Sequence, residues 1–212
     1  MRTRICSILV AAGMALSMQA TGSVIRYDDI PSYMGATTGL NLVDFEGIAP
    51  AGDAVASIAI NISGVQFIAD PFGFVVDDAF APLFDWSSGA VLAGGQAGAT
   101  LAMILPAGTT AFGMELMTIQ GGAPLFVLLS SGESFGVDTL ANPNRSFVGF
   151  TSDTAISSVL IAGGPLVIPM MDNFSFGLRS VPEPPPLALI LAAGIGVLWL
   201  KVRRSPSSQN LA

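Results

Sequence analysis

Three carboxylates and a tryptophan lie close together in the middle of the chain, at Asp77, Asp78, Asp85 and Trp86. Paired carboxylates beside a sugar-stacking ring would suit a glycoside hydrolase, in which one acid protonates the leaving oxygen and the other attacks or activates water. Adjacent side chains on a strand point to opposite faces, so Asp77 and Asp78 cannot flank one glycosidic bond. We therefore predict a solvated loop here, with Trp86 as a candidate platform for binding a sugar without catalysis.

Missing residue types exclude several other catalytic sites. Histidine is absent from all 212 residues, so a Ser-His-Asp nucleophilic arrangement is excluded. The one cysteine, Cys6, lies near the start of the chain, and the central part has no lysine for a phosphate-binding loop. We therefore predict that the protein is not an enzyme.

The last thirty or so residues contain three features in a fixed order. Prolines concentrate at 182–186, and an uncharged apolar run follows from Leu187 to Leu200. A basic cluster comes next: Lys201, Arg203 and Arg204. The 17 residues from Pro184 to Leu200 would form a helix about 25 Å long, which is short but usable in a bilayer core of about 30 Å. We predict a transmembrane helix rather than a buried helix of a soluble domain, because an apolar run without a polar face does not suit water.

The motif Val181-Pro182-Glu183-Pro184, the apolar run and the terminal arginines together resemble the PEP-CTERM sorting signal of Gram-negative bacteria. The resemblance covers about residues 180–204. It implies export, transient membrane anchoring and processing by an exosortase, a membrane protease. Carried over by position, the recognition motif is Pro182, Glu183 and Pro184, and the membrane stop is Lys201, Arg203 and Arg204. The polar tail 205–212 is longer than this family usually has.

The beginning of the chain has the features of a secretory signal peptide. Arg2 and Arg4 precede an apolar run from Ile5 to Ala15, and small residues follow. We predict cleavage after Gly22, with cleavage after Ala20 as the alternative. The expected partners are the Sec translocon and signal peptidase.

The part between these two ends is strongly acidic. From Ser23 to Leu178 it contains fourteen carboxylates and two arginines, a net charge of −12. Such a body is repelled by nucleic acid and by anionic lipid headgroups, so we expect no nucleic-acid partner. Its length of about 156 residues is enough for one domain with a real core.

The pattern of apolar residues in this body predicts strands. We expect 23–39 to be an irregular leader and Leu40–Glu46 to be the first strand. Val65, Phe67 and Ala69 alternate with Gln66 and Asp70 at a period of two. Short runs of this kind, separated by Gly/Pro turns and without a long helical pattern, predict an all-β antiparallel β-sandwich.

Three phrases of the body also resemble the jelly-roll-like β-sandwich that is common upstream of this sorting signal: Val43–Glu46, Phe147–Asp153 and Met171–Gly177. In sugar-binding modules of that fold the first and last strands lie side by side, and a structural Ca²⁺ often joins them. Calcium takes six to eight oxygen ligands. The resemblance therefore implies three ligands: Glu46, Asp172 and Asn173. The alternative is that they are exposed polar residues or local turn caps.

These observations predict four segments: a signal peptide at 1–22, a β-sandwich domain at 23–179, the sorting signal with its transmembrane helix at 180–204, and a short polar tail at 205–212. We expect an exported protein that is anchored in the inner membrane and then reaches the cell surface or the extracellular space. The sorting-signal resemblance implies a structural or adhesive role in a biofilm matrix, with extracellular polysaccharide as a partner. The alternative is a carbohydrate-binding module that uses Trp86, with structural Ca²⁺ as its only cofactor.

Overall fold

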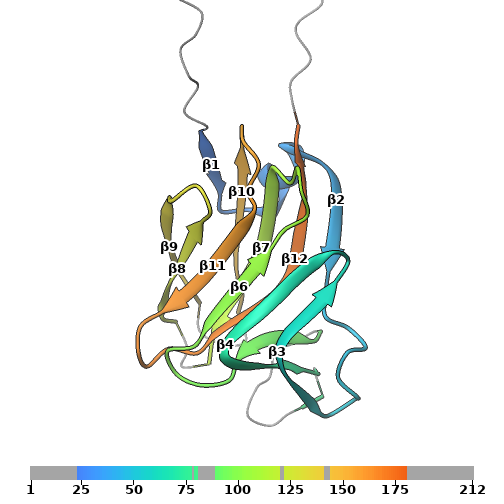
Figure 1. Cartoon of the computed structure of the whole chain (residues 1–212). Coiled ribbons are helices and arrows are strands. Elements are labelled where there is room, and N and C mark those ends of the chain that lie inside the picture. Colours follow the sequence, from blue (N-terminus) through green and yellow to red (C-terminus); the bar gives the residue numbers. More distant parts are fainter. Residues whose placement is uncertain (1–22, 78, 81–88, 120–121, 141–143, 181–212) are drawn as a thin grey trace, which may run out of the picture. The chain divides into compact units, whose positions relative to one another are not determined.

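The computed structural model describes residues 23–77, 79–80, 89–119, 122–140 and 144–180, which form an antiparallel β structure (Figure 1). The strands are β1 (Val24–Tyr27), β2 (Thr37–Val43), β3 (Ala54–Ile62), β4 (Val65–Val76), β5 (Val91–Gly94), β6 (Thr100–Ile104), β7 (Ala111–Thr118), β8 (Pro124–Leu129), β9 (Ser134–Asp138), β10 (Ser146–Ser152), β11 (Ser158–Gly163) and β12 (Pro169–Arg179). A short helix, α2 (Ile30–Gly35), lies between β1 and β2. The prediction of an all-β antiparallel fold is confirmed.

The strands form one hydrogen-bonded sheet that curls on itself. Its order is β1-β10-β7-β12-β5-β4-β6-β11-β8-β9, with β2 added beside β12 and β3 beside β4. Figure 1 shows that β4, β6 and β11 cross in front of β7 and β12, so the two halves of the sheet face each other like the layers of a sandwich. The strand β2 runs antiparallel to the last strand, β12.

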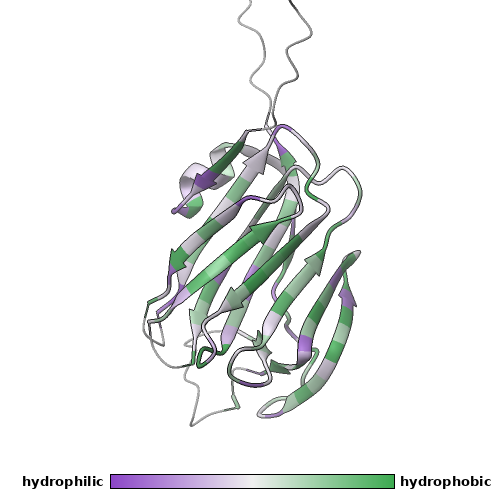
Figure 2. Ribbon diagram, turned by 60° about the vertical axis from the view of Figure 1, so that its left-hand side comes forward, coloured by the Kyte–Doolittle hydropathy of each residue, from purple (hydrophilic) through white to green (hydrophobic). Residues whose placement is uncertain are grey.

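The core lies between the two halves of the sheet. In β4 the predicted alternation is confirmed, because Val65, Phe67 and Ala69 are buried, and Figure 2 shows the same alternation of hydrophobic and polar positions along many strands. Phe67 of β4 meets Phe174 of β12 edge to face, with ring centroids 5.4 Å apart. Edge-to-face contacts of this kind add to the hydrophobic gain of burying the rings.

The prediction of an irregular leader at 23–39 is wrong. This segment forms β1, α2 and the start of β2. Asp29 caps the N-terminus of helix α2, and its Oδ1 accepts from the backbone N–H of Ser32 at 2.8 Å. Pro31 in the first turn costs no hydrogen bond. The strand predicted at Leu40–Glu46 also lies earlier in the chain, because β2 spans Thr37–Val43.

Both ends of the described chain meet at one carboxylate. Asp153 Oδ2 accepts from Ser23 Oγ at 2.8 Å, and Oδ1 pairs with the guanidinium of Arg179. Figure 1 shows that β1 begins and β12 ends at the same end of the sheet. We call this end, defined by Ser23, Asp153 and Arg179, the terminal pole.

Within the described ranges no helix is long and apolar enough to cross a bilayer. The predicted transmembrane helix, the sorting motif Pro182–Pro184, the membrane stop Lys201–Arg204 and the signal peptide all lie outside the described residues.

Candidate functional site

Two acidic side chains from neighbouring strands share one arginine. Arg145, just before β10, has its Nη1 atom 3.0 Å from Oε2 of Glu115 on β7, and the same atom pairs with Oδ2 of Asp172 on β12. Asp172 is 2% exposed. Burial raises the pKa of Asp172 to about 6, against the opposing effects of the Asn173 backbone N–H and of Arg145. A carboxylate buried this deeply requires its partner.

An irregularity in β12 brings Asn173 to the same group. The register with β7 shifts between Asp172 and Ser175, and Asn173 has a φ of +48°. Such a bulge re-aims side chains relative to the regular pleat. The amide nitrogen of Asn173 therefore reaches Glu115 and donates to its Oε2 at 2.8 Å.

The predicted ligand Glu46 lies near Asp172. Its Oε1 accepts from the backbone N–H of Ala90 at 2.8 Å. A Cβ added to Gly89 would be 2.7 Å from Oε1 of Glu46 and 3.4 Å from Oδ2 of Asp172, so both carboxylates border this glycine. The fold thus brings together residues that are far apart in the sequence.

The three predicted calcium ligands do not share one role in the structure. Asp172 pairs with Arg145, the amide of Asn173 donates to Glu115, and Glu46 accepts from a backbone N–H. Across the described ranges no group of three or more His, Cys, Asp and Glu residues is arranged to hold a metal ion. Calcium binding stays a prediction, with Arg145 as the cation that already faces Asp172.

The carboxylate of Asp77 has a structural role in a loop. Its Oδ1 accepts from the backbone N–H groups of Gly52 at 2.7 Å and Ala79 at 3.0 Å. Its predicted neighbours Asp78, Asp85 and Trp86 lie outside the described residues. Sugar binding through Trp86 therefore stays a prediction.

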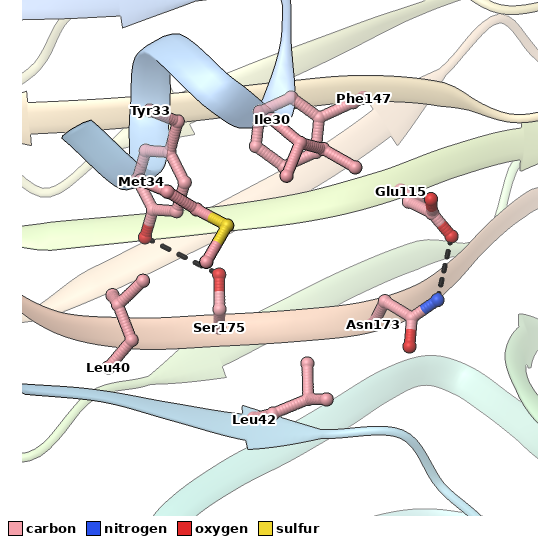
Figure 3. A pocket seen from close by; sticks show the side chains of 9 residues that line it. All are labelled: Ile30, Tyr33, Met34, Leu40, Leu42, Glu115, Phe147, Asn173 and Ser175. Atoms are coloured by element: carbon pink, nitrogen blue, oxygen red, sulfur yellow. Dashed lines mark hydrogen bonds between the residues drawn. The ribbon is translucent and has the colours of Figure 1, made fainter. Parts of the chain in front are cut away.

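Beside the charged group lies an apolar groove with a volume of about 290 Å³. Figure 3 shows its walls, which come from helix α2 on one side and strand β2 on the other, and its floor on β7, β10 and β12. The lining residues are Ile30, Tyr33, Met34, Leu40, Leu42, Glu115, Phe147, Asn173 and Ser175. We refer to this feature as the α2–β2 groove.

The polar atoms of the groove lie at its floor. Ser175 Oγ lies within hydrogen-bond distance of two oxygens, Tyr33 Oη at 3.4 Å and the carbonyl oxygen of Gly113 at 3.2 Å. Burial raises the pKa of Tyr33 to about 12, so its phenol is neutral at any physiological pH. Glu115 accepts from both Arg145 and Asn173. This arrangement suits binding of apolar groups rather than proton transfer, because its carboxylate is held by two donors.

Arg145, Glu115 and the whole α2–β2 groove were not predicted from the sequence. One signal for Arg145 was present in the composition, since the body from 23 to 178 has only two bases. A rare arginine in an acidic, apolar domain is a good candidate for pairing with a buried carboxylate.

Comparisons with known proteins give little. No protein-family profile matches the chain, and no curated protein does. The solved structure of a family two carbohydrate esterase from Cellvibrio japonicus is among those that align with the chain, with a TM-score of 0.35 and 14% identity. The alignment covers 62% of this chain and 36% of the esterase chain. At this TM-score the likeness supports no conclusion about fold or function.

Proposed function

We propose that the protein is an exported, non-enzymatic surface protein whose jelly-roll-like β-sandwich is carried by a C-terminal PEP-CTERM sorting signal with a transmembrane helix. The sorting signal is the segment 180–204, with the recognition motif Pro182, Glu183 and Pro184, and the signal peptide is 1–22. The domain would face the periplasm and then the cell surface or extracellular matrix.

The observation that supports this proposal best is the junction at Asp153. Ser23 is the first residue after the proposed signal peptide, and Arg179 directly precedes the proposed sorting segment. Both contact the carboxylate of Asp153. Because both ends of the domain lie at one pole, the signal peptide can be removed and the domain can be anchored through its C-terminal segment without disturbing the sheet.

Mass spectrometry of both termini tests the proposal. The full chain is produced in a Gram-negative host that has an exosortase, and protein is recovered from the inner membrane, the cell surface and the medium. We expect a new N-terminus at Ser23 or Thr21 and a C-terminus that lacks the basic cluster. A variant with Pro182→Ala, Glu183→Ala and Pro184→Ala should keep its C-terminus and stay in the inner membrane. An unprocessed wild-type chain in the cytosol would contradict the proposal.

A further inference from the structure

Strand β2 is an open edge of the sheet. It pairs with β12 on one side, and among the described residues no strand pairs with its other side. Natural edge strands are often protected from pairing by charged residues or proline. The strand Thr37–Val43 contains neither, but it has a bulge at Gly39, which has a φ of +62°. A bulge also protects an edge, so the part of β2 that is open to pairing is Leu40–Val43.

The backbone of β2 presents hydrogen-bonding groups at this edge. The carbonyl of Gly177 accepts a hydrogen bond from the backbone N–H of Thr110, just before β7. Because successive residues of a strand direct their backbone groups to opposite sides, Phe176 directs its N–H and carbonyl toward β2. Phe176 is paired with Asn41. The residues on either side of Asn41 therefore direct backbone groups away from β12, and these are Leu40 and Leu42.

The side chains of the same two leucines form one wall of the α2–β2 groove. Leu42 is 59% exposed, and Met34 and Ile30 on the opposite wall are exposed as well. An exposed apolar cluster beside a concave surface is typical of an interaction site. The edge and the groove together therefore form one surface, the β2 surface.

Charge indicates what kind of partner approaches this surface. The body carries a net charge of −12, so two copies repel each other over most of their surface. Strand β2 contains no charged residue, and the nearest in sequence is Asp44. It is therefore a strip along which two copies of this acidic domain can meet without opposing carboxylates.

We propose that the β2 surface is a self-association site, at which two copies pair antiparallel through their β2 strands. This inference rests on the proposed function: the strand pair would supply the contact through which an exported surface protein has an adhesive role in the matrix. Asn41 lies on the two-fold axis, opposite Asn41 of the second copy. Leu40 then faces Leu42 of the second copy, and the outward N–H and carbonyl groups of these residues meet.

This register satisfies both the backbone and the side chains. Leu40 and Leu42 point to the groove face in both copies, so the two α2–β2 grooves join across the axis into one apolar trough. Asp44 follows the last residue of β2, away from the axis at Asn41, so the two copies of Asp44 lie at opposite ends of the strand pair and do not oppose each other. A register shifted by one residue would separate the outward backbone groups from their partners.

The pairing also has a consequence for the tethers. In an antiparallel pair the second copy is reversed along the strand direction, so the two terminal poles, each marked by Asp153, point in opposite directions. The dimer therefore links two surfaces or two matrix layers rather than two neighbours on one membrane.

A strand edge of seven residues buries much less than the roughly 800 Å² per partner of a stable interface. The dimer is thus weak, and many parallel contacts strengthen adhesion.

Cysteine cross-linking of the full chain in detergent micelles tests the register. In a Cys6→Ser background, Asn41→Cys places two thiols on the axis, where the Cα atoms of a pair without backbone hydrogen bonds are about 4.5 Å apart, within the range for a disulfide. The matched control is Asn61→Cys, an exposed asparagine on the other long uncharged edge, β3. We expect at least about fivefold more disulfide dimer for Asn41→Cys under mild oxidation. Equal yields for the two variants would overturn the proposal.

Sedimentation of the full chain gives a second, independent test. Leu42→Lys puts a charge on the β2 surface, and we expect it to weaken the dimer by about tenfold or more, the cost of burying an unpaired charge. Phe126→Lys is the control, because Phe126 is a 48% exposed side chain on β8, far from β2 in the strand order. A wild-type chain that stays monomeric at the highest soluble concentration would overturn the proposal. Export and terminal processing do not depend on these variants, so this failure would leave the proposed function intact.

Discussion

The ring of Tyr33 lies directly on the α-carbon of Gly149. A Cβ added to Gly149 would be 2.5 Å from Cδ2 of Tyr33, and one added to its cross-strand partner Gly113 would be 3.0 Å from Cε1. This pair of glycines leaves a flat place on β7 and β10 where the ring is buried. It holds helix α2 against the sheet and thereby forms one wall of the α2–β2 groove.

We predict that Gly149→Ala destabilises the domain by about 1–3 kcal/mol, since the added methyl forces the ring or the strand to move. The control is Gly136→Ala in β9, where an added Cβ has no atom within 4 Å. Urea unfolding of both variants measures the difference. Equal stabilities would contradict the role given to the glycine pair.

The buried phenol of Tyr33 predicts a loss of stability at alkaline pH. Its pKa is raised to about 12 in the folded protein, against about 10 for an unfolded tyrosine. The contribution of the protonated phenol to the free energy of unfolding is complete below pH 10. It is lost as the pH rises toward 12, and the loss reaches roughly 2–3 kcal/mol at 1.36 kcal/mol per pH unit. Tyr33→Phe has no proton to lose, so its unfolding free energy should fall less between pH 9.5 and 11.5. Parallel curves for the two proteins would show that the phenol is not responsible.

Removal of the shared arginine should be costly. In Arg145→Met the carboxylate of Asp172, 2% exposed, loses its partner, which typically costs about 3–5 kcal/mol. Arg26→Met is the matched control because Arg26 pairs with Asp28 at the surface, where such pairs contribute at most about 1 kcal/mol. Chemical unfolding at pH 7 compares the two, and a smaller loss for Arg145→Met than for Arg26→Met would refute this account.

The Arg145→Met variant also tests the prediction of calcium binding. Without the arginine, Asp172 loses the cation that faces it, and Glu46 borders the same glycine, Gly89. Carboxylate oxygens are ligands that Ca²⁺ prefers. We expect millimolar Ca²⁺ to raise the melting temperature of Arg145→Met more than that of the wild type. Adding Glu46→Gln to this variant should reduce the rise, and an undiminished rise would remove Glu46 from the ligand set.

The junction at the terminal pole predicts local rather than global effects. Asp153 and Arg179 are both partly exposed, so Asp153→Asn should change global stability by less than about 1 kcal/mol. It removes a carboxylate oxygen that holds Ser23, so hydrogen exchange in β1 should become faster. Asp70→Asn, at an exposed aspartate of β4, serves as the control and should leave exchange in β1 unchanged.

Part of the fold could be predicted because it depends on neighbours in sequence. Val65, Phe67 and Ala69 repeat with the period of a strand, and burial of one face follows from that repeat. The segment at α2 was misjudged because six residues give too short a pattern to recognise. Its place depends on Tyr33 contacting Gly113 and Gly149, which are far away in the chain.

The sequence by itself determined the class of the body, its acidity and the absence of histidine chemistry, because composition and short-range periodicity carry this information. Only the tertiary structure decided that Arg145 faces Asp172, that Asp153 joins the two ends, and that Leu40 and Leu42 form an exposed wall beside an open edge. These relationships depend on strand pairing between residues as distant as Tyr33 and Ser175, which are 142 positions apart. Pairing at that range depends on how the whole sheet curls, and no local pattern of residues specifies it.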